Sequence, residues 1–70
     1  MKTERLIKMA NDISNYFNAE PNRKDAIDGV KNHIAHSWEP RMRKALIEYY
    51  QKDGSELSEL ARLAVAELKN

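Results

Sequence analysis

The hydrophobic positions of this chain recur every three or four residues, the spacing that places side chains on one face of an α-helix. No stretch alternates between apolar and polar residues for long enough to predict a strand. The pattern predicts four helical segments. Their inward faces are Leu6, Met9, Ala10, Ile13 and Phe17 in the first, Ile27, Val30 and Ile34 in the second, Met42, Ala45, Leu46 and Tyr49 in the third, and Leu57, Leu60, Ala61, Ala64, Val65 and Leu68 in the fourth.

The breaks between these segments hold residues that begin or end helices. Pro40 fits the first position of a helix, and the proline biases Glu39 toward an extended backbone. Gly54 can take the left-handed conformation that ends a helix, and Gly29 indicates a close approach of two helices. The predicted helices are Thr3–Asn18, Arg23–Ser37, one from Pro40 to a stop at Asp53-Gly54, and one capped by Ser55 or Ser58. We therefore expect an all-α fold, a small compact bundle of three to four short helices in a single domain over residues 1–70.

Composition narrows the possible functions. The chain has 70 residues, 12 Lys and Arg, 11 Asp and Glu, and a net charge of +1. A core of this size is too small to enclose a deep substrate pocket as well. The absence of cysteine excludes disulfides, thiolate zinc sites and cysteine-ligated iron–sulfur clusters. No segment has the apolar length of a membrane span, so we expect a cytoplasmic protein without a membrane partner.

No common catalytic pattern is present. The sequence lacks a glycine-rich phosphate loop, a nucleophile elbow and a His-Glu-x-x-His pair. His33 and His36 have a possible metal-ligand spacing, but no third ligand lies at an obvious position, so solvated or hydrogen-bonded histidines are the favoured interpretation. Tyr49 and Tyr50 are interpreted as packing residues. We expect no catalytic, cofactor-binding or metal-binding residue, and no enzymatic activity of the chain by itself.

Three cations occupy the start of the third predicted helix. Arg41, Arg43 and Lys44 lie where the positive end of the helix dipole disfavours positive charge, by about 0.3–1 kcal/mol each. Glu39, four residues before Arg43, compensates in part. The cluster is either a docking surface for an anionic partner or a solvated basic face, and the residues alone leave both interpretations open.

Apolar residues adjoin these cations. Trp38 lies at the corner between the second and third helices, where we expect partial burial in the core with one edge free for a partner. Ile47 and Tyr50 continue the line of Arg43 along the third helix. The predicted partner-binding residues are Trp38, Arg41, Arg43, Lys44, Ile47 and Tyr50.

A nucleic-acid-binding function is the alternative. The second and third helices with their short turn could form a helix-turn-helix, with the three cations at the start of the recognition helix. The near-neutral net charge and a Trp-Glu-Pro turn where glycine is common argue against it. We therefore predict no nucleic-acid partner and keep a small helix-turn-helix-like protein as the second hypothesis.

Several stretches of the chain resemble one protein family over almost the whole length. The most specific is His33-Ile34 followed by Trp38-Glu39-Pro40-Arg41-Met42-Arg43. Weaker likenesses are Lys8-Met9-Ala10-Asn11, Ile13, Tyr16-Phe17 and Pro21 near the start, and Leu57-Ser58, Leu60, Ala64 and Val65 near the end. With these residues the chain resembles the delta subunit of NAD-dependent, molybdenum-containing formate dehydrogenase.

The resemblance implies a non-catalytic accessory subunit of a complex that oxidises formate to carbon dioxide and reduces NAD. The molybdenum–pterin cofactor, iron–sulfur clusters, FMN and NAD would lie in the large subunits, and none in this chain. The implied partner is the molybdenum-bearing catalytic (alpha) subunit, which this chain would stabilise or help to mature. The cations Arg41, Arg43 and Lys44 would then be docking groups for acidic side chains or helix C-termini.

Overall fold

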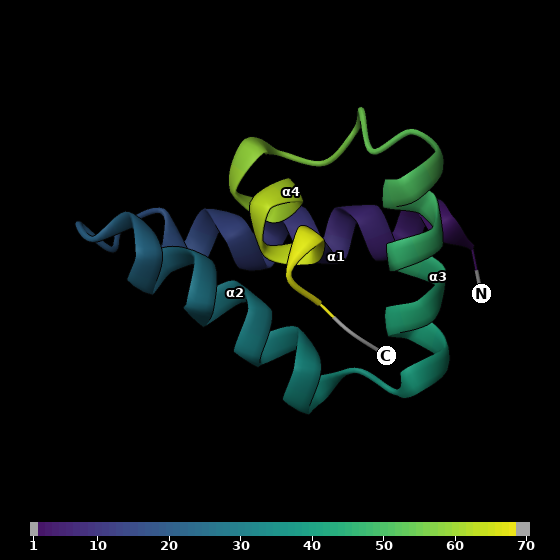
Figure 1. Cartoon of the computed structure of the whole chain (residues 1–70), viewed down its shortest axis with the longest axis horizontal. Helices are drawn as coiled ribbons and strands as arrows, with labels where there is room; N and C mark the ends of the chain where they lie inside the picture. The colour runs from purple at the N-terminus through teal and green to yellow at the C-terminus, as the bar shows by residue number, and fades with distance from the viewer. Residues whose placement is uncertain (1, 69–70) are drawn as a thin grey trace.

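Four helices make up most of the computed structural model, which describes residues 2–68 (Figure 1). They are α1 (Thr3–Phe17), α2 (Arg23–Ser37), α3 (Pro40–Lys52) and α4 (Glu59–Ala66). No strand occurs among the described residues. The all-α prediction is confirmed, and the helix bounds agree with the predicted ones to within a few residues. None of these helices is long and apolar enough to cross a membrane.

The two outer helices, α2 and α3, are held together by the other two. In Figure 1, α1 runs along the long axis of the molecule, α2 returns obliquely from its far end, and α3 lies across the end where α1 begins. Helix α4 lies between them and is seen almost end-on. Both α1 and α4 pack on each of the other helices, whereas α2 and α3 make little contact with each other. Their relative direction is therefore set by their packing on α1 and α4, together with the short corner that joins them.

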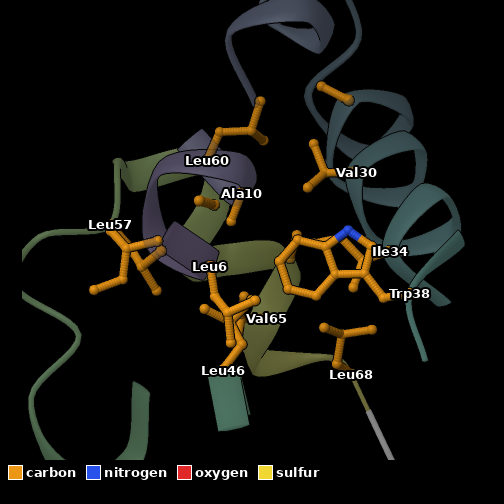
Figure 2. Packing of buried hydrophobic residues seen from close by; sticks show 14 residues of the cluster. Leu6, Ala10, Val30, Ile34, Trp38, Leu46, Leu57, Leu60, Val65 and Leu68 are labelled. Carbon is orange, nitrogen blue, oxygen red and sulfur yellow. The ribbon is translucent and has the colours of Figure 1, made fainter. Parts of the chain in front are cut away.

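The core gathers side chains from all four helices and from the segments beside them (Figure 2). Helix α4 has only eight residues, yet Leu60, Ala61, Ala64 and Val65 are all buried. Leu57 before α4 and Leu68 after it are buried as well. The entire predicted inward face of the fourth helix is thus confirmed, including the two residues that lie outside the helix.

The predicted inward face of α1 needs a correction. Ile7 and Ser14 are buried, while Met9, Ile13 and Phe17 are only half-buried. The buried face is therefore turned toward Ile7, because α1 has neighbours on more than one side. Ser14 tolerates burial because its hydroxyl donates a hydrogen bond to the Ala10 carbonyl oxygen, 3.0 Å away.

Two further inward faces are narrower than predicted. In α2, Ala26 is buried and Ile27 is half-buried. In α3, Leu46 is the buried residue, and the predicted Met42, Ala45 and Tyr49 are half-buried against the core.

Side-chain caps define two helix starts. The Asn22 side chain accepts a hydrogen bond from the Asp25 backbone N–H at 3.0 Å, at the start of α2. The Ser58 hydroxyl accepts one from the Ala61 N–H at 3.3 Å, so Ser58 rather than Ser55 caps α4. Gly54 has φ +72°, which confirms the predicted left-handed turn after α3.

The loop between α3 and α4 is fastened to α1 by one amide side chain. Asn11 Nδ2 donates to the Glu56 carbonyl oxygen at 2.9 Å, and Asn11 Oδ1 accepts from the Ser58 N–H at 2.8 Å. The Tyr49 hydroxyl accepts a third bond, from the Glu56 N–H at 2.9 Å. These bonds place Ser58 where it caps α4, so Asn11 positions the helix that contributes most to the core.

The close approach predicted at Gly29 is confirmed. The Phe17 ring at the end of α1 lies against Gly29 of α2, and a Cβ atom on Gly29 would lie 2.5 Å from ring atoms Cδ1 and Cε1. Real Cβ atoms do not come this close to another atom, so a larger residue at position 29 must displace the ring.

We expect Gly29→Ala to destabilise the protein by about 1–3 kcal/mol, the usual cost of overpacking. The loss should exceed the gain of about 1 kcal/mol that alanine brings inside a helix. Urea denaturation followed by circular dichroism measures the free energy of unfolding. In a Phe17→Ala background the same substitution should instead stabilise, because the ring is gone. Stabilisation in both backgrounds would show that the ring does not constrain position 29.

Candidate partner-binding site

The corner between α2 and α3 is anchored by Trp38. Its side chain is 5% exposed and points into the core near Ile34, Val65 and Leu68 (Figure 2). The Trp38 backbone is extended, and its N–H donates to the Ile34 carbonyl oxygen at 3.0 Å, where α2 ends. Core burial of Trp38 was expected, but the predicted free edge is almost absent. Trp38 therefore supports the surface around it rather than offering area to a partner.

Arg43 has partners inside the chain. Its Nη1 atom donates a hydrogen bond to the Ala35 carbonyl oxygen at 3.2 Å and another to the Trp38 carbonyl oxygen. Both carbonyls belong to the end of α2, where the last backbone acceptors have no partner within the helix. The negative end of the α2 dipole also favours a cation there. The position of Arg43 at the start of α3 is thus explained by α2, and it needs no external anion.

Arg41 and Lys44 differ from Arg43 in this respect. Both side chains are exposed, and within residues 2–68 neither forms an ion pair or a side-chain hydrogen bond. Residues two positions apart in a helix point about 200° away from each other, so Arg41 and Arg43 lie on different sides of α3. The three cations therefore do not form one cluster.

The predicted site consequently divides into three parts. Trp38 is in the core, and Arg43 is bound to the end of α2. Ile47 and Tyr50 follow Arg43 by four and seven residues and are half-buried against the core. Only Arg41 and Lys44 are exposed and free of partners among the described residues.

Two charged residues that the sequence analysis did not select complete the exposed side of α3. Glu48 and Lys52 follow Arg41 by seven and eleven residues, a spacing that repeats on one helix face, and both are exposed. We define the outer face of α3 as Arg41, Lys44, Glu48 and Lys52. Three cations and one carboxylate give this face a positive charge.

A shallow hollow borders the outer face of α3. It measures about 240 Å³ and is lined by Thr3, Ala45, Glu48, Tyr49 and Lys52. Thr3 belongs to the start of α1, so the outer face of α3 adjoins the first turn of that helix. The hollow is open and small, and it can receive a partner side chain rather than enclose a substrate.

The two histidines do not gather possible metal ligands around them in the described part of the chain. His33 and His36 are both exposed, and no group of three or more His, Asp or Glu side chains among residues 2–68 could hold a metal ion. The pKa of Lys24 is raised from 10.5 because its ammonium donates a hydrogen bond to the Asp28 carboxylate. This exposed pair lies on α2 and provides no acid or base to the α3 surface.

The fold and the surface define a small all-α domain with a charged, open helix face. The family model that matches the chain, over residues 5–65, is described as NADH-dependent formate dehydrogenase delta subunit FdsD. Because the match covers most of the 70 residues, the chain belongs to this delta-subunit family. No curated protein and no solved structure matches the chain. The resemblance found in the sequence is thereby confirmed.

The different surroundings of the two arginines lead to a stability prediction. Arg43→Met keeps the aliphatic part of the side chain but leaves the Ala35 and Trp38 carbonyls without their donor. We expect a loss of about 1–3 kcal/mol in the free energy of unfolding, the range for hydrogen bonds made by charged groups. Arg41→Met is the matched control and should change stability by less than about 0.5 kcal/mol. Equal losses for the two variants in urea denaturation would refute the capping role of Arg43.

Proposed function

We propose that this chain is a non-catalytic accessory subunit that binds the molybdenum-bearing catalytic (alpha) subunit of its formate dehydrogenase. In this proposal the outer face of α3 is the contact surface, and binding stabilises the catalytic subunit or assists its maturation. Membership of the delta-subunit family supports a place in a formate dehydrogenase complex. The observation that supports the choice of surface is that Arg41 and Lys44 have no partner among residues 2–68.

The energetics favour an anionic partner at this surface. Arg41 lies in the first turn of α3, where the helix dipole disfavours a cation by about 0.3–1 kcal/mol, and Lys44 follows in the second turn, where this cost is smaller. Glu39, the N-cap residue of α3, compensates only in part, and no acidic side chain lies in the first turn itself. Carboxylates or a helix C-terminus of the catalytic subunit would remove this cost on binding. Charged groups of this kind also steer the encounter and fix its orientation.

The remaining predicted site residues take other roles in the proposal. Ile47 and Tyr50 provide half-buried apolar area on the flank of α3, at the rim of the contact. Trp38 and Arg43 fix the direction of α3 relative to α2. In this proposal Trp38 and Arg43 support the contact surface from within. Arg41, Lys44, Ile47 and Tyr50 are the predicted site residues that touch the partner.

The cofactors of the complex are expected to lie in other subunits. The chain has no cysteine, and its described residues contain no group of three possible metal-ligating side chains. We therefore assign the molybdenum–pterin, iron–sulfur, FMN and NAD sites to the large subunits, and we propose a cytoplasmic location for the whole complex.

The helix-turn-helix hypothesis gains no support from the geometry. Helices α2 and α3 pack on α1 and α4 rather than on each other. One of the three cations expected at the recognition helix, Arg43, is bonded to the end of α2. Only two free cations remain at the start of α3, few for the counterion release that supports DNA affinity. We expect no nucleic-acid partner.

Charge reversal on the outer face of α3 tests the proposal. The double variant Arg41→Glu, Lys44→Glu should weaken binding to the catalytic subunit by at least about 2 kcal/mol, the scale of an interface hot spot. Co-purification with the tagged catalytic subunit measures binding, and circular dichroism checks the fold. Arg43 stays unchanged because its substitution would disturb the corner.

Arg62→Glu is the control for added negative charge, since Arg62 is exposed on a different helix, α4. It should bind like the original protein. If the folded double variant co-purifies at the original yield, the outer face of α3 is not the interface.

A further inference from the structure

A second surface with unusual chemistry lies at the end of α1. Tyr16 is 77% exposed, the most exposed large apolar side chain among the described residues. Its ring meets the Phe17 ring edge-to-face, with centroids 5.1 Å apart and planes at 88°. Phe17 is in turn fixed against Gly29. The exposed Tyr16 ring thus contacts a ring that is itself packed against α2.

Two open hollows share this aromatic pair. One measures about 490 Å³ and is lined by Asp12, Ile13, Tyr16, Phe17 and His33. The other measures about 350 Å³ and is lined by Tyr16, Phe17, Ala19 and Glu20. We call the residues Asp12, Ile13, Tyr16, Phe17, Glu20 and His33 the aromatic hollow. Tyr16 and Phe17 line both hollows, so a side chain entering either one meets an aromatic ring.

The carboxylates in this lining indicate the charge of a suitable occupant. Asp12 and Glu20 lie four residues before and after Tyr16, and no Lys or Arg lines either hollow. Lys8 bonds one oxygen of Asp12, Oδ2, at 3.0 Å, but both side chains stay more than half exposed. An aromatic ring flanked by carboxylates fits a cation, because the ring face and the carboxylates both attract positive charge.

The aromatic hollow lies far from the outer face of α3. Figure 1 shows α3 at the end of the long axis where α1 begins, and the α1–α2 turn at the opposite end. Tyr16 belongs to the last turn of α1, close to that opposite end. The two surfaces also have opposite charge, basic on α3 and acidic around Tyr16. One chain can therefore contact an acidic surface and a basic segment at the same time.

We propose that the aromatic hollow binds an arginine or lysine side chain carried by a segment of another formate dehydrogenase subunit. The cation lies against the Tyr16 ring, and its donors reach Asp12 or Glu20. The guanidinium of arginine suits the hollow better than an ammonium, since it is planar and stacks on aromatic rings. This inference rests on the proposed function for the identity of the complex, but it uses a surface that the α3 contact does not include.

The test uses the complete complex, co-expressed and purified through a tag on the catalytic subunit. Tyr16→Ser should lower retention of this chain by about tenfold in a salt-wash titration, the effect of about 1.4 kcal/mol. The fold should be unaffected because the Tyr16 side chain is exposed. Leu63→Ser is the matched control, since Leu63 on α4, 40% exposed, is the second exposed large apolar residue within residues 2–68. It should be retained normally.

Two further measurements identify the occupant. The double variant Asp12→Asn, Glu20→Gln should flatten the salt dependence of retention, because it removes the negative charge at the aromatic hollow. A photo-crosslinking benzophenone amino acid in place of Tyr16 should attach to a peptide of another subunit that contains arginine or lysine. Crosslinks only to a second copy of this chain would overturn the proposal, as would normal retention of Tyr16→Ser.

The outcomes separate the two proposals. If the α3 charge reversal releases the chain but Tyr16→Ser does not, the aromatic hollow is not a contact and the α3 interface stands. If Tyr16→Ser alone releases it, the aromatic hollow stands and the α3 interface fails. If the unsubstituted chain does not co-purify with any subunit, both proposals fail.

Discussion

The hydrogen bonds from Arg43 to the end of α2 close the corner on which the candidate surface depends. Helices α2 and α3 barely pack on each other, so the angle between them is set by their packing on α1 and α4 and by the corner that joins them. Trp38 holds the corner to the core, Pro40 starts α3 at once, and Arg43 ties the first turns of α3 back to the Ala35 and Trp38 carbonyls. The primary role of the Trp-Glu-Pro-Arg-Met-Arg stretch is therefore to form the corner between α2 and α3.

The other junction, between α3 and α4, is held by hydrogen bonds from side chains outside the loop. It contains a longer loop without helix, whose backbone donors and acceptors need partners outside it. Asn11 and Tyr49 supply three of them. A helix of eight residues is marginal by itself, so α4 depends on being placed correctly over the core that it helps to fill. Polar bonds at the two junctions thus determine where a small apolar core can form.

The sequence was sufficient for the helices because each signal for them is local. Pro40, Gly54 and the caps act within one turn, and the apolar spacing within each helix marks its buried side. The contacts that shape the candidate site are not local. Asn11 bonds residues 45 and 47 positions away. The partners of Arg43 are near in sequence, but they come within reach only because the corner folds α3 back toward the end of α2. Ser14 was missed because its burial depends on a hydroxyl bond that hydrophobicity does not report.

The distinction between local signals and contacts made only in the folded chain also changes how a charged residue on α3 should be interpreted. Arg41 and Arg43 are alike in sequence and two residues apart, yet one faces water and the other completes a neighbouring helix. A charged residue that opposes its own helix dipole has three explanations, an external anion, the end of another helix or a solvated surface. Arg43 has the second explanation, whereas Arg41 has no partner among residues 2–68, and for Arg41 we propose the first. Loss of binding after substitution of Arg43 would therefore report a disturbed corner, whereas loss after substitution of Arg41 would report the contact itself. The exposed Tyr16 poses the same question for apolar residues, since its aromatic contact among residues 2–68 is the Phe17 ring.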